Sequence, residues 1–161
     1  MDIFEFAMKK ERLSEEYYRQ LAGKTSQKGL QSIFSMLADE EAHHYQVVEQ
    51  MRSKTPDKVA STDVLAEAKE VFARMSEGTR KFDFDAGEVQ IYKKARDIEE
   101  ESWKFYLQKA DEVEDPGQKG IFRKLADEEK KHYFLLENII DFVSRPETWL
   151  ENAEFYHLEE Y

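Results

Sequence analysis

Nearly the same nine-residue phrase occurs twice in this chain of 161 residues, and this repetition constrains the fold more than any other feature. Residues 37–45 read LADEEAHHY, and residues 125–133, which lie 88 positions later, read LADEEKKHY. At the same offset, residues 3–51 align with residues 91–139 without a gap, and 18 of the 49 aligned pairs are identical. A likeness of this length indicates two copies of one structural unit.

Each repeat is predicted to form a helical hairpin. In both halves of both repeats, apolar and small residues recur every three or four positions, as they do on one face of a helix. The segments GKTSQKG (23–29) and VEDPGQKG (113–120) interrupt these patterns, and Pro116 is well placed to open the helix that follows. Two antiparallel helices in each repeat therefore predict a four-helix bundle.

The residues between and after the repeats are predicted to be partly helical. The second and third bundle helices must run parallel, so the connection has to return along a helix of about 35 Å. We expect a short helix over residues 62–76 of this connection, and Asp85 with Glu88 is typical of a helix start. The predicted organisation is one all-α domain over residues 1–161, with repeat units 3–51 and 91–139, a crossover 54–87 and a C-terminal helix 146–160.

Composition excludes several classes of function. A formal net charge of −11 argues against a nucleic acid or an anionic membrane as the partner. The chain contains no cysteine, which excludes disulfides, iron-sulfur clusters and thiol catalysis. The N-terminal residues lack the pattern of a secretory signal, and no apolar run approaches the length of a membrane span. We therefore expect a soluble cytoplasmic protein.

A glutamate interrupts the apolar stripe of every predicted bundle helix, and two of the helices add a histidine. These residues are Glu11, Glu41, Glu99, Glu129, His44 and His132. Burying an ionised glutamate without a partner costs roughly several kcal/mol, which a marginally stable fold does not tolerate four times. Neither apolar stripe contains a lysine or arginine near the glutamates, whereas the charge of two divalent cations neutralises the charge of four carboxylates. The sequence therefore predicts a six-ligand metal site.

The motif Glu-x-x-His is weak evidence by itself, because residues three apart project side by side on any helix. The chain contains two further examples, Glu40 with His43 and Glu154 with His157. Lys131 replaces the histidine at the position that matches His43, and His157 lies outside both repeats. We interpret both histidines as surface or tail residues. The duplicated set follows the pattern of di-metal carboxylate bundles, and a hydrogen-bonded polar core is its alternative.

These motifs resemble those of the ferritin-like di-iron proteins, most closely the rubrerythrin group. In the shared pattern a Glu is followed seven residues later by Tyr, and then by LA-x-EE-x-x-H. It occurs here as ERLSEEYY, LADEEAHH, EEESWKFY and LADEEKKH, within a resemblance that covers residues 3–140. The resemblance implies a ferritin-like four-helix bundle of two duplicated hairpins, joined by a long crossover with a short helix and followed by a short C-terminal helix.

The resemblance also implies a role for each ligand. Glu11 and Glu99 are expected as terminal ligands, and Glu41 and Glu129 as bridging ligands. His44 and His132 are expected to give one nitrogen to each metal. Two iron ions are the implied cofactor, although manganese or zinc fits the same donors.

The chain departs from this family in two respects. Rubrerythrins proper carry an additional iron domain with four cysteines, and this sequence has none. They also place a further glutamate one turn after the ligand of the third bundle helix, where this chain has Ser102. Electrons must therefore come from elsewhere, and peroxidase efficiency does not transfer directly.

Four residues near the ligands have expected supporting roles. Glu40 and Glu128 are candidates to accept the spare N–H of a ligand histidine from another helix, with exposed acidic residues as the alternative. Tyr18 and Tyr106 lie two turns from Glu11 and Glu99 on the same helix face. We favour core packing with a satisfied hydroxyl for these tyrosines over a redox or proton relay.

The expected function is a di-iron oxidoreductase that reduces peroxide or dioxygen, because six protein ligands leave coordination positions free on two ions. An external rubredoxin-like or flavin protein is the expected electron donor, and a homodimer is the expected assembly. The alternatives are a ferroxidase or iron-storage protein and a helical bundle that metal only stabilises. A small organic substrate is a further hypothesis, with an apolar pocket lined by Phe34, Phe122 and tyrosines.

Overall fold

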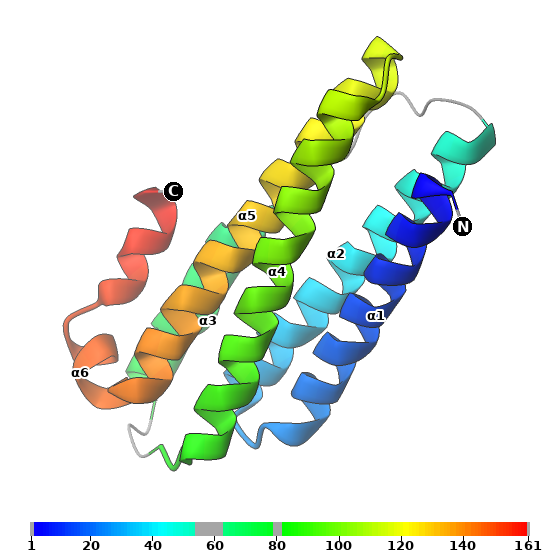
Figure 1. Ribbon diagram of the computed structural model, residues 1–161. Coiled ribbons are helices and arrows are strands. Elements are labelled where there is room, and N and C mark those ends of the chain that lie inside the picture. The colour runs from blue at the N-terminus through cyan, green and yellow to red at the C-terminus, as the bar shows by residue number, and fades with distance from the viewer. Residues whose placement is uncertain (1, 54–62, 79–81, 161) are drawn as a thin grey trace.

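Four long helices run side by side in the computed structural model, as the repeat predicts (Figure 1). They are α1 (Ile3–Lys24), α2 (Lys28–Ser53), α4 (Ala86–Glu112) and α5 (Pro116–Ser144). The shorter elements are α3 (Val64–Glu77), α6 (Pro146–Glu151) and the 3-10 helix η1 (Glu154–Glu160). The structure describes residues 2–53, 63–78 and 82–160, and these ranges contain no strand. The predicted all-α bundle is confirmed.

Three of the long helices begin with an aspartate that caps the first turn. In each case the carboxylate accepts a hydrogen bond of 2.8 Å from the backbone N–H three residues later, and the caps are Asp2, Asp85 and Asp115. These bonds satisfy backbone donors that have no partner inside the helix. The predicted start at Asp85 is confirmed, and Pro116 occupies the first turn of α5 as expected.

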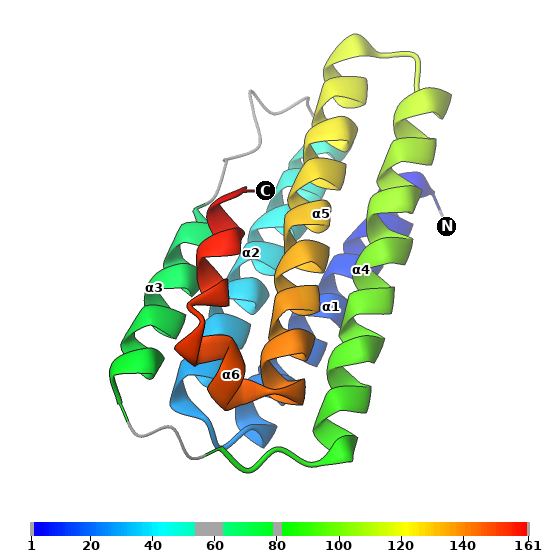
Figure 2. The same ribbon diagram turned by 90° about the vertical axis from the view of Figure 1, so that its left-hand side faces the viewer.

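The helices pair within each repeat and then pack together. α1 packs along α2 and α4 packs along α5, whereas contacts between the two hairpins are much sparser. The elements α3, α6 and η1 pack against one another and against α2 and α5, on one side of the bundle (Figure 2). These three described elements therefore leave the opposite face, between α1 and α4, open. None of the helices in the described ranges is both long and apolar enough to cross a membrane.

The helices observed in the crossover and at the C-terminal end agree in part with those predicted from the sequence. The short helix expected at residues 62–76 is α3, while residues 54–62 and 79–81 of the predicted crossover lie outside the described residues. The single C-terminal helix expected over residues 146–160 is divided into α6 and η1. The division occurs at Ala153, whose φ of 52° is left-handed and does not continue an α-helix.

The core consists of two apolar clusters, one toward each end of the bundle. The first contains Phe34 together with Phe72 and Trp149 from the packed side elements, and the second contains Val48 and Phe122. Phe34 and Phe122 are fully buried in different clusters, so these two rings do not form the apolar pocket that the sequence suggested. The predicted metal ligands lie in the layer between the two clusters.

Candidate metal centre

The structure brings all six predicted ligands together in this layer. Each helix contributes from a position between residues of the two apolar clusters: Glu11 from α1, Glu41 and His44 from α2, Glu99 from α4, and Glu129 and His132 from α5. The six side chains are buried, and each residue is at most 2% exposed. The amphipathic pattern of the helices therefore places charged groups inside the bundle, where water cannot stabilise them.

The ligand atoms form two overlapping groups. One group contains Glu11, Glu41, His44 and Glu129, and the other contains Glu41, Glu99, Glu129 and His132; within each group the donor atoms lie within 4.8 Å of one another. Glu41 and Glu129 belong to both groups, whereas each remaining residue belongs to one. This is the arrangement in which two carboxylates bridge a pair of ions.

Each histidine faces a glutamate of the other repeat through its Nδ1 atom. His44 Nδ1 lies 2.7 Å from Glu129 Oε1, and His132 Nδ1 lies 2.8 Å from Glu41 Oε1. Glu11 Oε2 is 3.7 Å from His44 Nδ1, and Glu99 Oε1 is 3.3 Å from His132 Nδ1. The Nδ1 atoms are therefore the nitrogens that are positioned as metal ligands.

The carboxylates also carry oxygens that nothing else in the described protein satisfies. While all four groups are ionised, the Oε2 atoms of Glu11, Glu41, Glu99 and Glu129 are buried and receive no hydrogen bond from the described residues. Buried polar atoms in proteins are nearly always paired, so four carboxylate oxygens without donors in one layer suit the binding of cations. Oxygen and imidazole nitrogen are donors that suit iron, manganese and zinc. The residues present therefore fit a pair of divalent metal ions.

Without metal, the four carboxyl groups divide into two kinds. Burial, followed by the charges of the neighbouring carboxylates, raises the pKa of Glu41 and of Glu129 well above the ordinary value. Burial also acts to raise the pKa of Glu99, but a hydrogen bond from Glu129 and the charge of His132 outweigh it and hold the pKa at about 2. The pKa of Glu11 is lowered in the same way, against burial, by Glu41 and His44. Without metal, Glu41 and Glu129 are therefore the two carboxyl groups of this cluster that favour the protonated form.

Two tyrosines connect the repeats at this layer. Tyr18 OH donates to Glu99 Oε1 at 2.5 Å, and Tyr106 OH donates to Glu11 Oε1. Both tyrosines are buried, and their hydroxyls are satisfied. The sequence placed each tyrosine two turns from the glutamate of its own helix, but its partner is the glutamate of the other repeat.

The Nε2 atoms of His44 and His132, which point away from the donor groups, differ in their contacts. His132 Nε2 lies 2.8 Å from Glu40 Oε1, as the sequence predicts for a supporting carboxylate. His44 Nε2 is buried without a hydrogen-bond partner in the described part of the chain. Glu128, the counterpart of Glu40, is fully buried and forms ion pairs with Lys131 at 3.2 Å and Lys124 at 3.6 Å. The two halves of the centre are therefore similar but not equivalent.

The two remaining histidines stay outside the ligand groups. His43 is half-buried beside His44, with 6.2 Å between the ring centroids, and burial lowers its pKa. His157 is exposed on η1, and the nearby Glu154 pairs with Arg145. Neither histidine belongs to the two groups of donor atoms described above.

Comparison with known families agrees with this centre. The chain matches the Rubrerythrin family model over residues 2–140, which includes all four bundle helices up to the last turn of α5. Comparison with the curated proteins and with the solved structures gave no match. Because the family match spans most of the chain, this protein belongs to the rubrerythrin family of ferritin-like di-iron proteins.

Proposed function

We propose that this protein is a di-iron carboxylate oxidoreductase that reduces peroxide or dioxygen with electrons from an external donor. The observation that carries the proposal is the set of four glutamate Oε2 atoms without donors and two Nδ1 atoms, gathered in a buried layer between two apolar clusters. A ferrous pair, when bound, supplies two electrons together, as peroxide reduction requires. The family membership supports iron as the metal.

Each of the two ions would be bound by its own pair of residues and by two glutamates that both ions share. Glu11 with His44, and Glu99 with His132, would serve one ion each, and Glu41 and Glu129 would serve both; the two overlapping groups of donor atoms support this division. Four carboxylates balance the charge of two divalent ions, so the buried layer becomes neutral. The tyrosine hydroxyls fix the orientation of Glu11 and Glu99 by donating to one oxygen of each. Six protein ligands leave coordination positions for a small oxidant.

The electrons are proposed to come from outside these residues. The sequence contains no cysteine, so none of its residues forms a rubredoxin-type iron site. A rubredoxin-like or flavin protein is the proposed donor, and a homodimer is the proposed assembly. A solution mass of about two chains agrees with this assembly, whereas a closed shell of many chains favours iron storage.

The test uses protein loaded anaerobically with ferrous iron and mixed rapidly with hydrogen peroxide or with dioxygen. We expect two ferrous ions per chain, oxidised by one equivalent of peroxide, with a rise in near-ultraviolet absorption. Glu41→Gln removes a shared ligand and should abolish this reaction. Glu49→Gln changes an exposed glutamate of the same helix and serves as the control.

Three other results would redirect the assignment. Ferrous protein that stays unchanged with both oxidants leaves only a structural role for the metal. Oxidation that continues beyond two ions per chain, with the iron retained, indicates iron storage. Binding of only one ferrous ion per chain contradicts the proposal of a site for two metal ions.

A further inference from the structure

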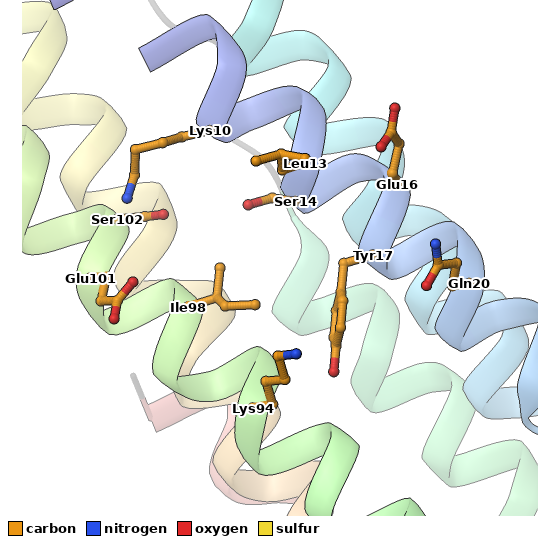
Figure 3. Close-up of a pocket in the computed structure, with 10 residues that line it drawn as sticks. All are labelled: Lys10, Leu13, Ser14, Glu16, Tyr17, Gln20, Lys94, Ile98, Glu101 and Ser102. Atoms are coloured by element: carbon orange, nitrogen blue, oxygen red, sulfur yellow. The ribbon is translucent and has the colours of Figure 1, made fainter. Parts of the chain in front are cut away.

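A groove of about 380 Å³ opens between α1 and α4, on the face that α3, α6 and η1 leave open (Figure 3). Its lining includes Leu13, Ser14 and Tyr17 from α1 and Ile98 and Ser102 from α4. This volume is at the lower end of the roughly 300–1,000 Å³ found for small-molecule sites. It is also many times the roughly 10–15 Å³ of cavity volume that one water needs, so the groove is much larger than hydrogen peroxide needs.

The inner part of the groove lies close to the metal centre. Ser14 and Ser102 are 5% and 4% exposed, and in Figure 3 their hydroxyls point toward each other across the gap. Each serine follows a predicted ligand by three residues, Glu11 on α1 and Glu99 on α4, and residues three apart share a helix face. Because serine is small, the space between the helices extends inward to within one turn of these ligands.

The chemistry of the lining favours an uncharged, compact apolar group. Leu13, Ile98 and the ring of Tyr17 present carbon surface to the groove (Figure 3). Two lysines and two glutamates also line it, so their charges cancel: Lys10, Lys94, Glu16 and Glu101. The Tyr17 hydroxyl is occupied, because it donates to the backbone oxygen of Ile91 at 2.9 Å. Gln20 also lines the groove, and among the described lining residues Ser14 and Ser102 are the buried polar ones.

We propose that this groove binds the organic part of a hydroperoxide of the aryl-alkyl class, with its peroxide group directed inward between Ser14 and Ser102. The proposal rests on the proposed function and specifies its substrate class. The overall reaction breaks the O–O bond and consumes two electrons and two protons, giving one alcohol and one water. A ferrous pair, when bound, would supply the two electrons, and solvent would supply the two protons.

The first test measures binding without turnover. Zinc-loaded protein, which cannot transfer electrons, is titrated with 2-phenyl-2-propanol, the alcohol that cumene hydroperoxide would yield. We expect saturable shifts in the amide resonances of residues around Ser14 and Ile98, and no comparable shifts at the groove beside Ile140 on α5. Shifts that are absent, or that are spread over the whole surface, overturn the proposal.

The second test compares two substrates in iron-loaded protein. Ile98→Trp fills the groove, and Ile140→Trp makes the same change at a half-buried position that lines a different groove. Losing a fitted apolar contact changes discrimination by roughly 10- to 200-fold. We expect Ile98→Trp to lower the ratio of kcat/KM for cumene hydroperoxide to kcat/KM for hydrogen peroxide at least about tenfold. Ile140→Trp should leave this ratio unchanged.

The two proposals fail in different ways. Saturable binding of the alcohol in the zinc protein, with no oxidation of the ferrous protein by either peroxide, contradicts the proposed function and leaves the groove as a binding site. Oxidation by hydrogen peroxide with an unchanged substrate ratio in Ile98→Trp contradicts the groove alone. If Ile98→Trp slows only the reduction of the iron by the electron donor, and not the reaction with either peroxide, the groove is a docking site for the donor and the substrate proposal is overturned.

Discussion

Tyr106 on α4 donates its hydroxyl hydrogen to Glu11 on α1, so a residue of the second repeat fixes a predicted ligand of the first. Tyr18 on α1 makes the reciprocal bond to Glu99 on α4. Burial, and then the nearby carboxylates, raise the pKa of both tyrosines well above the ordinary value. The hydroxyls therefore remain protonated donors, and each bond leaves the other oxygen of its glutamate for a metal ion.

Removing one of these hydroxyls is expected to weaken the centre. Tyr106→Phe leaves Glu11 without its donor, and losing a hydrogen bond to a charged group costs about 1.5–3 kcal/mol. We expect the free energy of unfolding of the metal-loaded protein to fall by about this amount. Tyr17→Phe is the control, because the Tyr17 hydroxyl bonds to a backbone oxygen and not to a ligand. An equal fall in the free energy of unfolding of the two metal-loaded variants, measured by urea unfolding, would contradict the assigned role.

Neutralising a shared glutamate is expected to stabilise the metal-free protein while it removes metal binding. Glu41 is 1% exposed and lies among three other carboxyl groups, so its charged form is unfavourable without a cation. We expect Glu41→Gln to raise the melting temperature of metal-free protein by a few degrees, which corresponds to about 1 kcal/mol. Added metal should then give no further increase. Glu49→Gln, which changes an exposed site, should alter neither property, as thermal unfolding with and without metal can show.

The stability of the metal-free protein should fall as pH rises. The pKa values of Glu41 and Glu129 are raised by burial and by neighbouring carboxylates, so both groups keep protons in the folded state that the unfolded chain releases near pH 4.5. The pKa of His132 is also raised, because Glu99 and Glu40 outweigh the opposing effect of burial. Its contribution is present below the unfolded value of 6.5 and is lost as pH rises through the folded value.

Glu11 and Glu99 do not oppose this fall in stability with rising pH above about pH 5. Glu99, with its pKa of about 2, and Glu11 are ionised in both states there, and their stabilisation is lost only as pH falls. Urea unfolding of metal-free protein at pH values of about 5.5 and 8 should therefore show lower stability at the higher pH. Zinc-loaded protein should show the reverse, because metal displaces the protons. A metal-free protein that gains stability with pH would exclude the protonated bridging pair.

The fold and the gathering of the six predicted ligands in one buried layer could be predicted because the sequence repeats its pattern. One glutamate on an apolar stripe is ambiguous, but four at matching positions, with His44 and His132 in register, leave few alternatives. The crossover helix followed from geometry, since parallel neighbours need a return path along the bundle. Local sequence did not predict that Ala153 divides the C-terminal helix, because alanine favours helix and rarely adopts a left-handed φ.

The side-chain contacts between helices of different hairpins could not be predicted from the local sequence pattern. Local sequence does not pair Tyr106 with Glu11, because the choice between a partner on the same helix and one across the bundle depends on how the hairpins pack. The groove was missed for a related reason. Ser102 stood out only as a missing glutamate, whereas the structure places it opposite Ser14 at a sparse helix contact. Both features depend on the spacing between the hairpins.

The unequal outer contacts of the two histidines predict two unequal metal ions. His132 Nε2 faces Glu40 at 2.8 Å, and a carboxylate in this position typically strengthens metal affinity 10- to 100-fold. Glu40→Gln keeps the shape of the side chain and removes its charge, so we expect about tenfold weaker binding of one ion and little change for the other. Stepwise metal titration followed by calorimetry distinguishes the two steps. Asp39→Asn, at the neighbouring position on the exposed side of α2, should leave both steps unchanged, and uniform weakening of both ions by Glu40→Gln would show that the two halves act as one.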